Sequence, residues 1–139
     1  MKNVLIYIHL IFLFSCDVGN PIENVSISNL LHDNSSKVWV VDQEFEDGVE
    51  KTKQNQNFKT AFAFFDDYTF TEQPINTIGN RPPTYGEYTL IEGRPVIEFK
   101  VKNSKNQFVI ISSSKEQIIL KSVEKPIIKL VLIPFPKLF

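Results

Sequence analysis

The stretch "PVIEFKVK", residues 95–102, alternates apolar and charged side chains from Ile97 onward. Successive side chains of an extended strand point to opposite faces. Ile97, Phe99 and Val101 therefore share one face, and the glutamate and lysines that follow them share the other. This alternation predicts a β-strand with one face in a core and the other in solvent. It is the clearest such pattern in the chain.

Seven further segments are rich in β-branched and aromatic residues, as strands are. They are "KVWVVDQEF" (37–45), "FKTAFAFF" (58–65), "YTFTEQ" (68–73), "YGEYTLI" (85–91), "QFVIIS" (107–112), "QIILKSV" (117–123) and "IIKLVLI" (127–133). Short polar turns such as Asp66-Asp67 and Asn103–Asn106 join most of them. We therefore expect residues 37–139 to form an all-β domain. Its architecture should be an antiparallel meander of about eight strands, closed as a small barrel or folded as a sandwich.

Two connections, residues 46–57 and 72–84, are long. Alternate connections of an up-and-down meander lie at opposite ends, so both long loops are expected at one end and the start of the first strand at the other. The stretch from 72 to 88 combines a stiff Pro-Pro pair with apolar and aromatic side chains around an arginine. Such residues either contact a partner protein or cap the barrel as part of the core. They are Ile75, Ile78, Arg81, Tyr85 and Tyr88.

Length and composition exclude several classes of protein. The chain has 139 residues, the size of one domain, and a net charge of −1, which disfavours a nucleic-acid binder. Its single cysteine cannot form a disulfide within the chain, and two histidines are too few for most familiar metal sites. We expect no metal and no cofactor.

Catalytic chemistry is not expected either. His32 is the only histidine outside the apolar N-terminal run, and we expect it to be solvated. Asp66-Asp67 fits a hairpin turn, and the acidic cluster at 44–47 fits the end of a strand. Nothing in the sequence opposes two carboxylates across a cleft, as glycosidase chemistry requires. The sequence therefore favours a binding protein with no catalytic residues.

An apolar run of eleven residues, Val4 to Phe14, follows a short start that carries one lysine. As a helix it would span only about 16 Å of a hydrocarbon core about 30 Å thick, so we expect a signal peptide over residues 1–15. The run ends in "LFSC" (13–16), which resembles a bacterial lipobox. That resemblance implies that Cys16 carries a diacylglycerol and a further acyl chain such as palmitate. Residues 16–36 would then be a lipidated tether with a possible short helix.

From Val38 to Phe135 the chain resembles the lipocalin-like domains of Bacteroidota lipoproteins. The resemblance rests on Trp39 in the first strand and on "FFDDYTF" (64–70), "YGEYTL" (85–90) and "IIKLVLIPF" (127–135). It implies a small barrel whose closed end is plugged by Trp39. It also implies attachment through Cys16 to a bacterial membrane, here expected to be the outer membrane, on a face that the sequence does not define.

The sequence leaves two functions open. One is a lipid-anchored envelope protein that binds a protein partner or an envelope component through the long loops. The alternative is a carrier of a small apolar ligand inside the barrel, with candidate interior residues Trp39, Phe62, Phe64, Phe99 and Val101. An open cavity lined by these residues would favour the carrier, whereas a filled interior would favour the loops.

Overall fold

The computed structural model describes residues 26–136; Cys16 and the expected signal peptide lie outside the described residues. A short helix precedes nine strands, and two single turns of 3-10 helix lie in the long loops. The elements are α1 (Ile27–His32), β1 (Ser36–Glu46), β2 (Val49–Glu50), η1 (Gln56–Phe58), β3 (Thr60–Phe65), β4 (Thr69–Pro74), η2 (Ile75–Thr77), β5 (Thr84–Leu90), β6 (Val96–Val101), β7 (Ser104–Ser113), β8 (Ile118–Ser122) and β9 (Ile128–Pro134).

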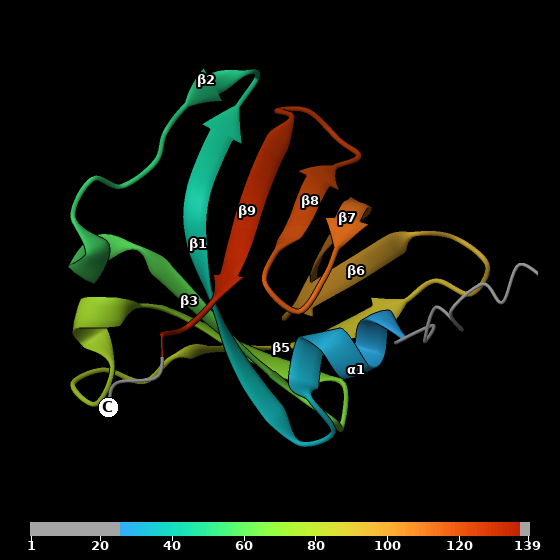
Figure 1. The fold of residues 1–139 in the computed structure, drawn as a ribbon, viewed down its shortest axis with the longest axis horizontal. Helices are drawn as coiled ribbons and strands as arrows, with labels where there is room; N and C mark the ends of the chain where they lie inside the picture. The colour runs from blue at the N-terminus through green and yellow to red at the C-terminus, as the bar shows by residue number, and fades with distance from the viewer. Residues whose placement is uncertain (1–25, 137–139) are drawn as a thin grey trace, which may run out of the picture.

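The strands form one antiparallel sheet in the order β2-β1-β3-β4-β5-β6-β7-β8-β9, and β1 also pairs with β9 (Figure 1). This pairing runs from Trp39↔Pro134 to Glu46↔Ile128 and closes β1 and β3–β9 into a barrel. Closure removes the unpaired strand edges that promote aggregation. The prediction of an all-β meander of eight strands is confirmed, and the barrel, not the sandwich, is the form that it takes.

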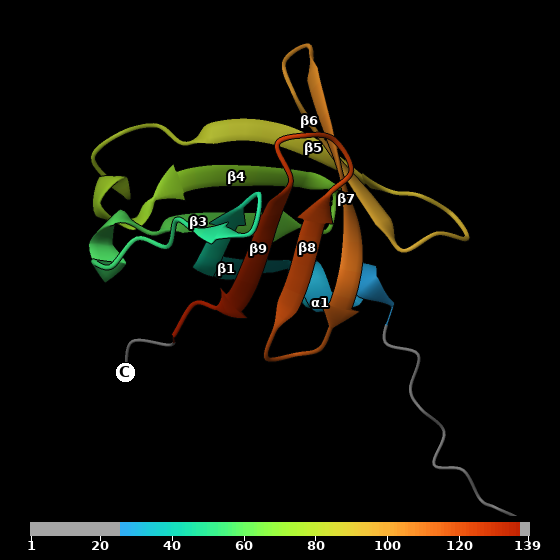
Figure 2. The ribbon, with the colours of Figure 1, turned by 90° about the horizontal axis from the view of Figure 1, so that it is seen from above.

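Two details of the strands differ from the sequence analysis. The two-residue strand β2 was not predicted; it pairs with the end of β1 through Phe45↔Glu50 and Glu46↔Val49. The turn expected at 103–106 is shorter, because Val101 already pairs with Ser104. Only Lys102 and Asn103 remain between β6 and β7, and Lys102 takes a positive φ of 53°, as tight hairpin turns require. Figure 2 shows this hairpin projecting beyond the rest of the barrel.

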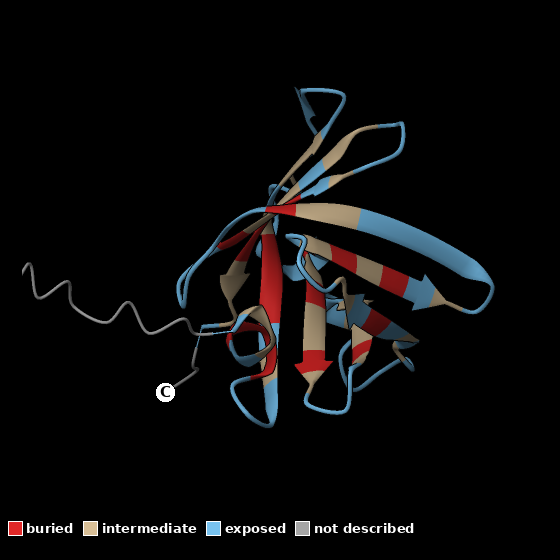
Figure 3. Cartoon of the chain, turned by 90° about the vertical axis from the view of Figure 1, so that its right-hand side faces the viewer, coloured by how far each residue is buried: buried red, intermediate tan, exposed pale blue. Residues whose placement is uncertain are grey.

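Buried residues alternate with more exposed ones along the strands, as the colours of Figure 3 show. The buried set forms one cluster inside the barrel. Gly86 on β5 has to be glycine, since a Cβ there would lie 2.5 Å from the Phe70 ring and 2.7 Å from the Lys100 carbonyl oxygen. Phe70 packs edge-on to Phe99, with 5.1 Å between the ring centroids. The prediction that Ile97 and Phe99 face the core is confirmed.

Helix α1 closes one end of the barrel. The Ser26 hydroxyl caps it by accepting a hydrogen bond from the Asn29 backbone. Leu31 is 1% exposed, and its carbonyl accepts a hydrogen bond from the Trp39 indole at 3.0 Å. His32 is also buried, so the expectation of a solvated histidine is wrong. This short helix, which lies within the segment 16–36 expected to be a tether with a possible short helix, buries one side against the barrel.

The two long loops lie together at the end opposite α1. The backbone amide of Ile75, in η2, donates to the Lys59 carbonyl, which follows η1, at 3.0 Å. The expectation that both loops share one end is therefore confirmed. Within residues 26–136, no helix is long and apolar enough to cross a membrane.

Candidate functional site

The barrel interior is hollow toward the end that carries the long loops. The cavity has a volume of about 250 Å³ and is open on one side. Seven of the eight barrel strands contribute to its wall. The wall consists of Val41, Glu44, Thr60, Phe62, Phe64, Phe70, Glu72, Phe99, Val101, Asn106, Phe108, Leu120, Ile128, Leu130 and Leu132.

The polarity of the wall changes along the cavity. Phe64 and Phe70 are fully buried and lie toward α1, on the strand ends next to the 66–68 turn. Glu72 and Thr60 follow on the same inward faces, nearer the long loops. The polar residues thus lie toward the open end, where Phe62 pairs with Glu72 and Phe99 with Asn106, while Phe64 and Phe70 lie deeper. This arrangement suits a ligand with an apolar body and a polar end.

Glu44 on β1 and Glu72 on β4 are half-buried, and their carboxylates have no ion-pair or side-chain hydrogen-bond partner within residues 26–136. Burial, and second the negative charge of Glu44, raises the pKa of Glu72 above its usual value. A carboxylate in an apolar wall is costly because it loses water without gaining a cation. The ionised Glu72 carboxylate, at the open end of the cavity, therefore destabilises the folded protein.

The Glu72→Gln variant tests whether the charge of Glu72 destabilises the folded protein. A carboxyl group whose pKa is raised on folding costs stability when it is ionised, and the cost disappears as the pH falls below the unfolded-state pKa near 4.5. We therefore expect Glu72→Gln to have a higher urea midpoint than the wild type at pH 7.5. The two proteins should converge at pH 4. The control is Glu92→Gln, in the exposed turn between β5 and β6. A Glu72→Gln midpoint at or below that of the wild type at pH 7.5 would contradict the assignment.

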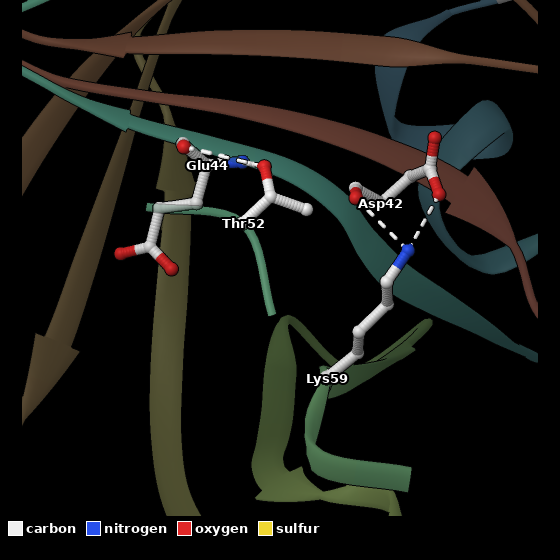
Figure 4. Close-up of polar contacts among 4 residues, drawn as sticks. All are labelled: Asp42, Glu44, Thr52 and Lys59. Carbon is white, nitrogen blue, oxygen red and sulfur yellow. Dashed lines mark hydrogen bonds and ion pairs between the residues drawn. The ribbon is translucent and has the colours of Figure 1, made fainter. Parts of the chain in front are cut away.

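The cavity mouth is shaped by a bend in β1. The register of β1 against β9 shifts between Val41 and Gln43, and β1 stops pairing with β3 at Val40. Beyond that point the edge of β1 is covered by β2 and by Thr52, whose hydroxyl accepts a hydrogen bond from the Glu44 backbone at 3.0 Å (Figure 4). The Glu44 carboxylate points away from Thr52 in this view.

Lys59 fills the position where β1 and β3 diverge. Only 5% exposed, it places its Nζ 2.8 Å from the Asp42 carboxylate and 3.0 Å from the Asp42 carbonyl oxygen (Figure 4). Asp42 lies at the register shift of β1. This ion pair therefore connects the bend in β1 to the base of both long loops.

We expect Lys59→Met to destabilise the protein by about 2 kcal/mol, because two hydrogen bonds from a charged donor are lost while the apolar stem is kept. Urea unfolding followed by circular dichroism measures this. The matched control is Lys53→Met, in the same loop but exposed. If both variants have the same unfolding free energy as the wild type, the ion pair is not structural.

Four of the five residues predicted to line a barrel interior meet in the cavity: Phe62, Phe64, Phe99 and Val101. The fifth, Trp39, is fully buried but forms no part of the cavity wall. It lies against α1 and donates a hydrogen bond to the Leu31 carbonyl there.

The loop residues predicted as partner contacts separate into two groups. Ile78, Arg81 and Tyr85 are exposed, and Ile75 is half-buried. Tyr88 is only 2% exposed, and its hydroxyl donates to the Phe65 carbonyl at the closed end, so it is a core residue and not a loop contact. Burial, with smaller contributions from Tyr68, Asp67 and Asp66, raises the pKa of Tyr88 to about 12.

Glu44 and Glu72 were not predicted as part of a site. Glu72 lies two residues after Phe70, so strand alternation alone places both on one face. Glu44 could not be found in this way, because the bulge between Val41 and Gln43 changes the parity of β1. Within the described residues, no three His, Cys, Asp or Glu side chains are grouped to hold a metal ion.

Comparison of the chain with protein-family models, with curated proteins and with solved structures finds no match.

Proposed function

We propose that the protein binds a small, mainly apolar ligand inside its barrel while a lipid on Cys16 holds it to the bacterial envelope. The observation that carries the first part is the open cavity of about 250 Å³, lined by Phe62, Phe64 and Phe99. Small barrels whose interior is filled have no such space. A hollow interior is a cost to packing, so its presence supports a binding role.

Because one end of the barrel is closed and the other is open, a ligand enters from the open end. Helix α1 and Trp39 block one end, so a ligand enters between the long loops at the other. The described chain starts at the closed end, in α1. A lipid on Cys16 would therefore place the closed end toward the membrane and the mouth away from it. The membrane of attachment in this proposed arrangement is the outer membrane.

Ligand binding is tested by purifying the full chain from bacterial membranes. Small molecules in an organic extract of the purified protein are then identified by mass spectrometry. We expect one compound near equimolar with the protein. Asn106→Trp, which places a large ring at the exposed rim of the cavity, should lose it. Gln107→Trp is the matched control, because Gln107 is the next residue on β7 and bonds outward to Glu98. A wild-type extract that contains no more small molecule than the Asn106→Trp extract would refute the proposal.

Partner binding through the loops is a second candidate, favoured by exposed apolar side chains near the mouth. Phe58 is 54% exposed, Ile78 46% and Tyr85 69%. A photo-crosslinking residue at position 58 or 78 should then give one defined protein adduct in intact cells. The same residue at Ile111, which is equally exposed on the outer wall, should give none. Identical adduct patterns at all three positions would reject this candidate.

A further inference from the structure

The cavity described above has an acidic end as well as an apolar one. Of the residues in its wall, two are carboxylates and none is basic. Glu44 and Glu72 come from different strands, β1 and β4, and both side chains reach the same space. The other polar wall residues, Thr60 and Asn106, are neutral. The polar end of a bound ligand thus meets negative charge and neutral hydrogen-bonding groups.

We propose that the ligand is an amphiphile whose head carries a positive charge, seated between Glu44 and Glu72 with its apolar body among the phenylalanines. This inference rests on the proposed binding function and specifies the chemical class of the ligand. An ammonium head would supply both carboxylates with the partner that residues 26–136 do not give them. It would also remove the repulsion between the two like charges.

Other head groups fit less well. The carboxylate of a fatty acid or a phosphate head would be repelled by Glu44 and Glu72. Lys102, on the β6–β7 turn, shares an outer groove with Glu72 but does not line the cavity itself. Within residues 26–136 the only ion pairs are Lys59–Asp42 and Lys105–Glu98, so Lys102 does not neutralise Glu72 by direct contact.

The volume of the cavity limits the size of the ligand's apolar body. A dry apolar cavity of about 150 Å³ accepts benzene. The cavity here, about 250 Å³, has room for one ring with a short side chain or for a short alkyl chain. A chain of about eight carbons is therefore a suitable probe.

Three probes with the same chain and different heads test the inference: n-octylammonium, n-octanol and octanoate. The full chain is held in phosphatidylcholine nanodiscs, which carry no net charge. Binding is followed through the methyl resonances of Leu130 and Leu132 in the cavity wall, so that partition into lipid is not counted. We expect n-octylammonium to bind at least about tenfold more tightly than octanoate, as a charge-assisted contact provides.

Glu72→Gln and Glu44→Gln should each reduce the ratio of octylammonium to octanoate affinity by about tenfold. Glu92→Gln, outside the cavity, should leave the ratio unchanged. The inference is overturned if octanoate binds as tightly as octylammonium, or if neither cavity substitution changes the affinity ratio. In either case, binding of n-octanol would still support the carrier function. If none of the three probes shifts the wall methyls, the binding function itself fails.

Discussion

Replacing Trp39 with alanine is expected to destabilise the barrel by about 3–5 kcal/mol, the largest effect of any single core substitution in this chain. Trp39 has no exposed surface, and its indole donates to the Leu31 carbonyl at 3.0 Å. The Lys37 ammonium lies over the ring, 4.2 Å from its centroid. The substitution therefore leaves a cavity and an unpaired carbonyl, and α1 loses its hydrogen bond to the barrel. Urea unfolding at neutral pH measures the free-energy change.

The Trp39→Phe variant separates the contribution of packing to stability from that of the hydrogen bond. It keeps an aromatic ring but removes the donor to Leu31, so its cost should be clearly smaller than that of alanine. Val38→Ala is a control at the neighbouring position, where 37% of the side chain is exposed. A Trp39→Ala cost below about 1 kcal/mol would show that α1 and Trp39 do not close the barrel.

Replacing Cys16 with serine is expected to abolish fatty-acid labelling of the protein. Serine has no thiol, so the thioether to diacylglycerol cannot form. One acyl chain holds a protein to a membrane only reversibly, whereas two or more hold it firmly, so the wild type should resist extraction with high salt. Metabolic labelling with an alkyne analogue of palmitate, followed by mass spectrometry of the N-terminal peptide, measures the modification.

Fractionation alone is not decisive for this variant, because an uncleaved apolar segment could itself hold the chain to the membrane. A second variant therefore combines Cys16→Ser with an ordinary cleavable signal sequence in place of residues 1–15. It should be released into the soluble fraction. Palmitate labelling that persists in Cys16→Ser, or release of the wild type by salt, would contradict the lipid anchor.

The barrel strands could be predicted because period-two alternation is a local property of the sequence. Ile97, Phe99 and Val101 face inward as their spacing requires. Helix α1 is different, since six residues are too few for a stable isolated helix. It is held by Leu31 and by contact with Trp39, and these contacts exist only in the folded chain. Strand β2 likewise depends on its pairing with Phe45 and Glu46.

The cavity could be predicted only in part. Alternation places Phe62, Phe64 and Phe99 on inward faces, yet it does not say whether their rings fill the interior. That depends on how closely strands distant in the chain approach one another. The position of Glu44 depends on a single bulge, which no pattern in "KVWVVDQEF" indicates. The acidic end of the cavity is therefore a finding of the structure.

Intermolecular nuclear Overhauser effects between n-octanol and the full chain in nanodiscs test the central claim, that the barrel interior is a ligand site. The predicted result is a set of contacts from the terminal methyl of octanol to the rings of Phe62 and Phe108, which are half-buried in the cavity wall. No contact is expected to Ile111 on the outer wall. Contacts confined to the outer wall and the lipid, with none to Phe62 or Phe108, would contradict it.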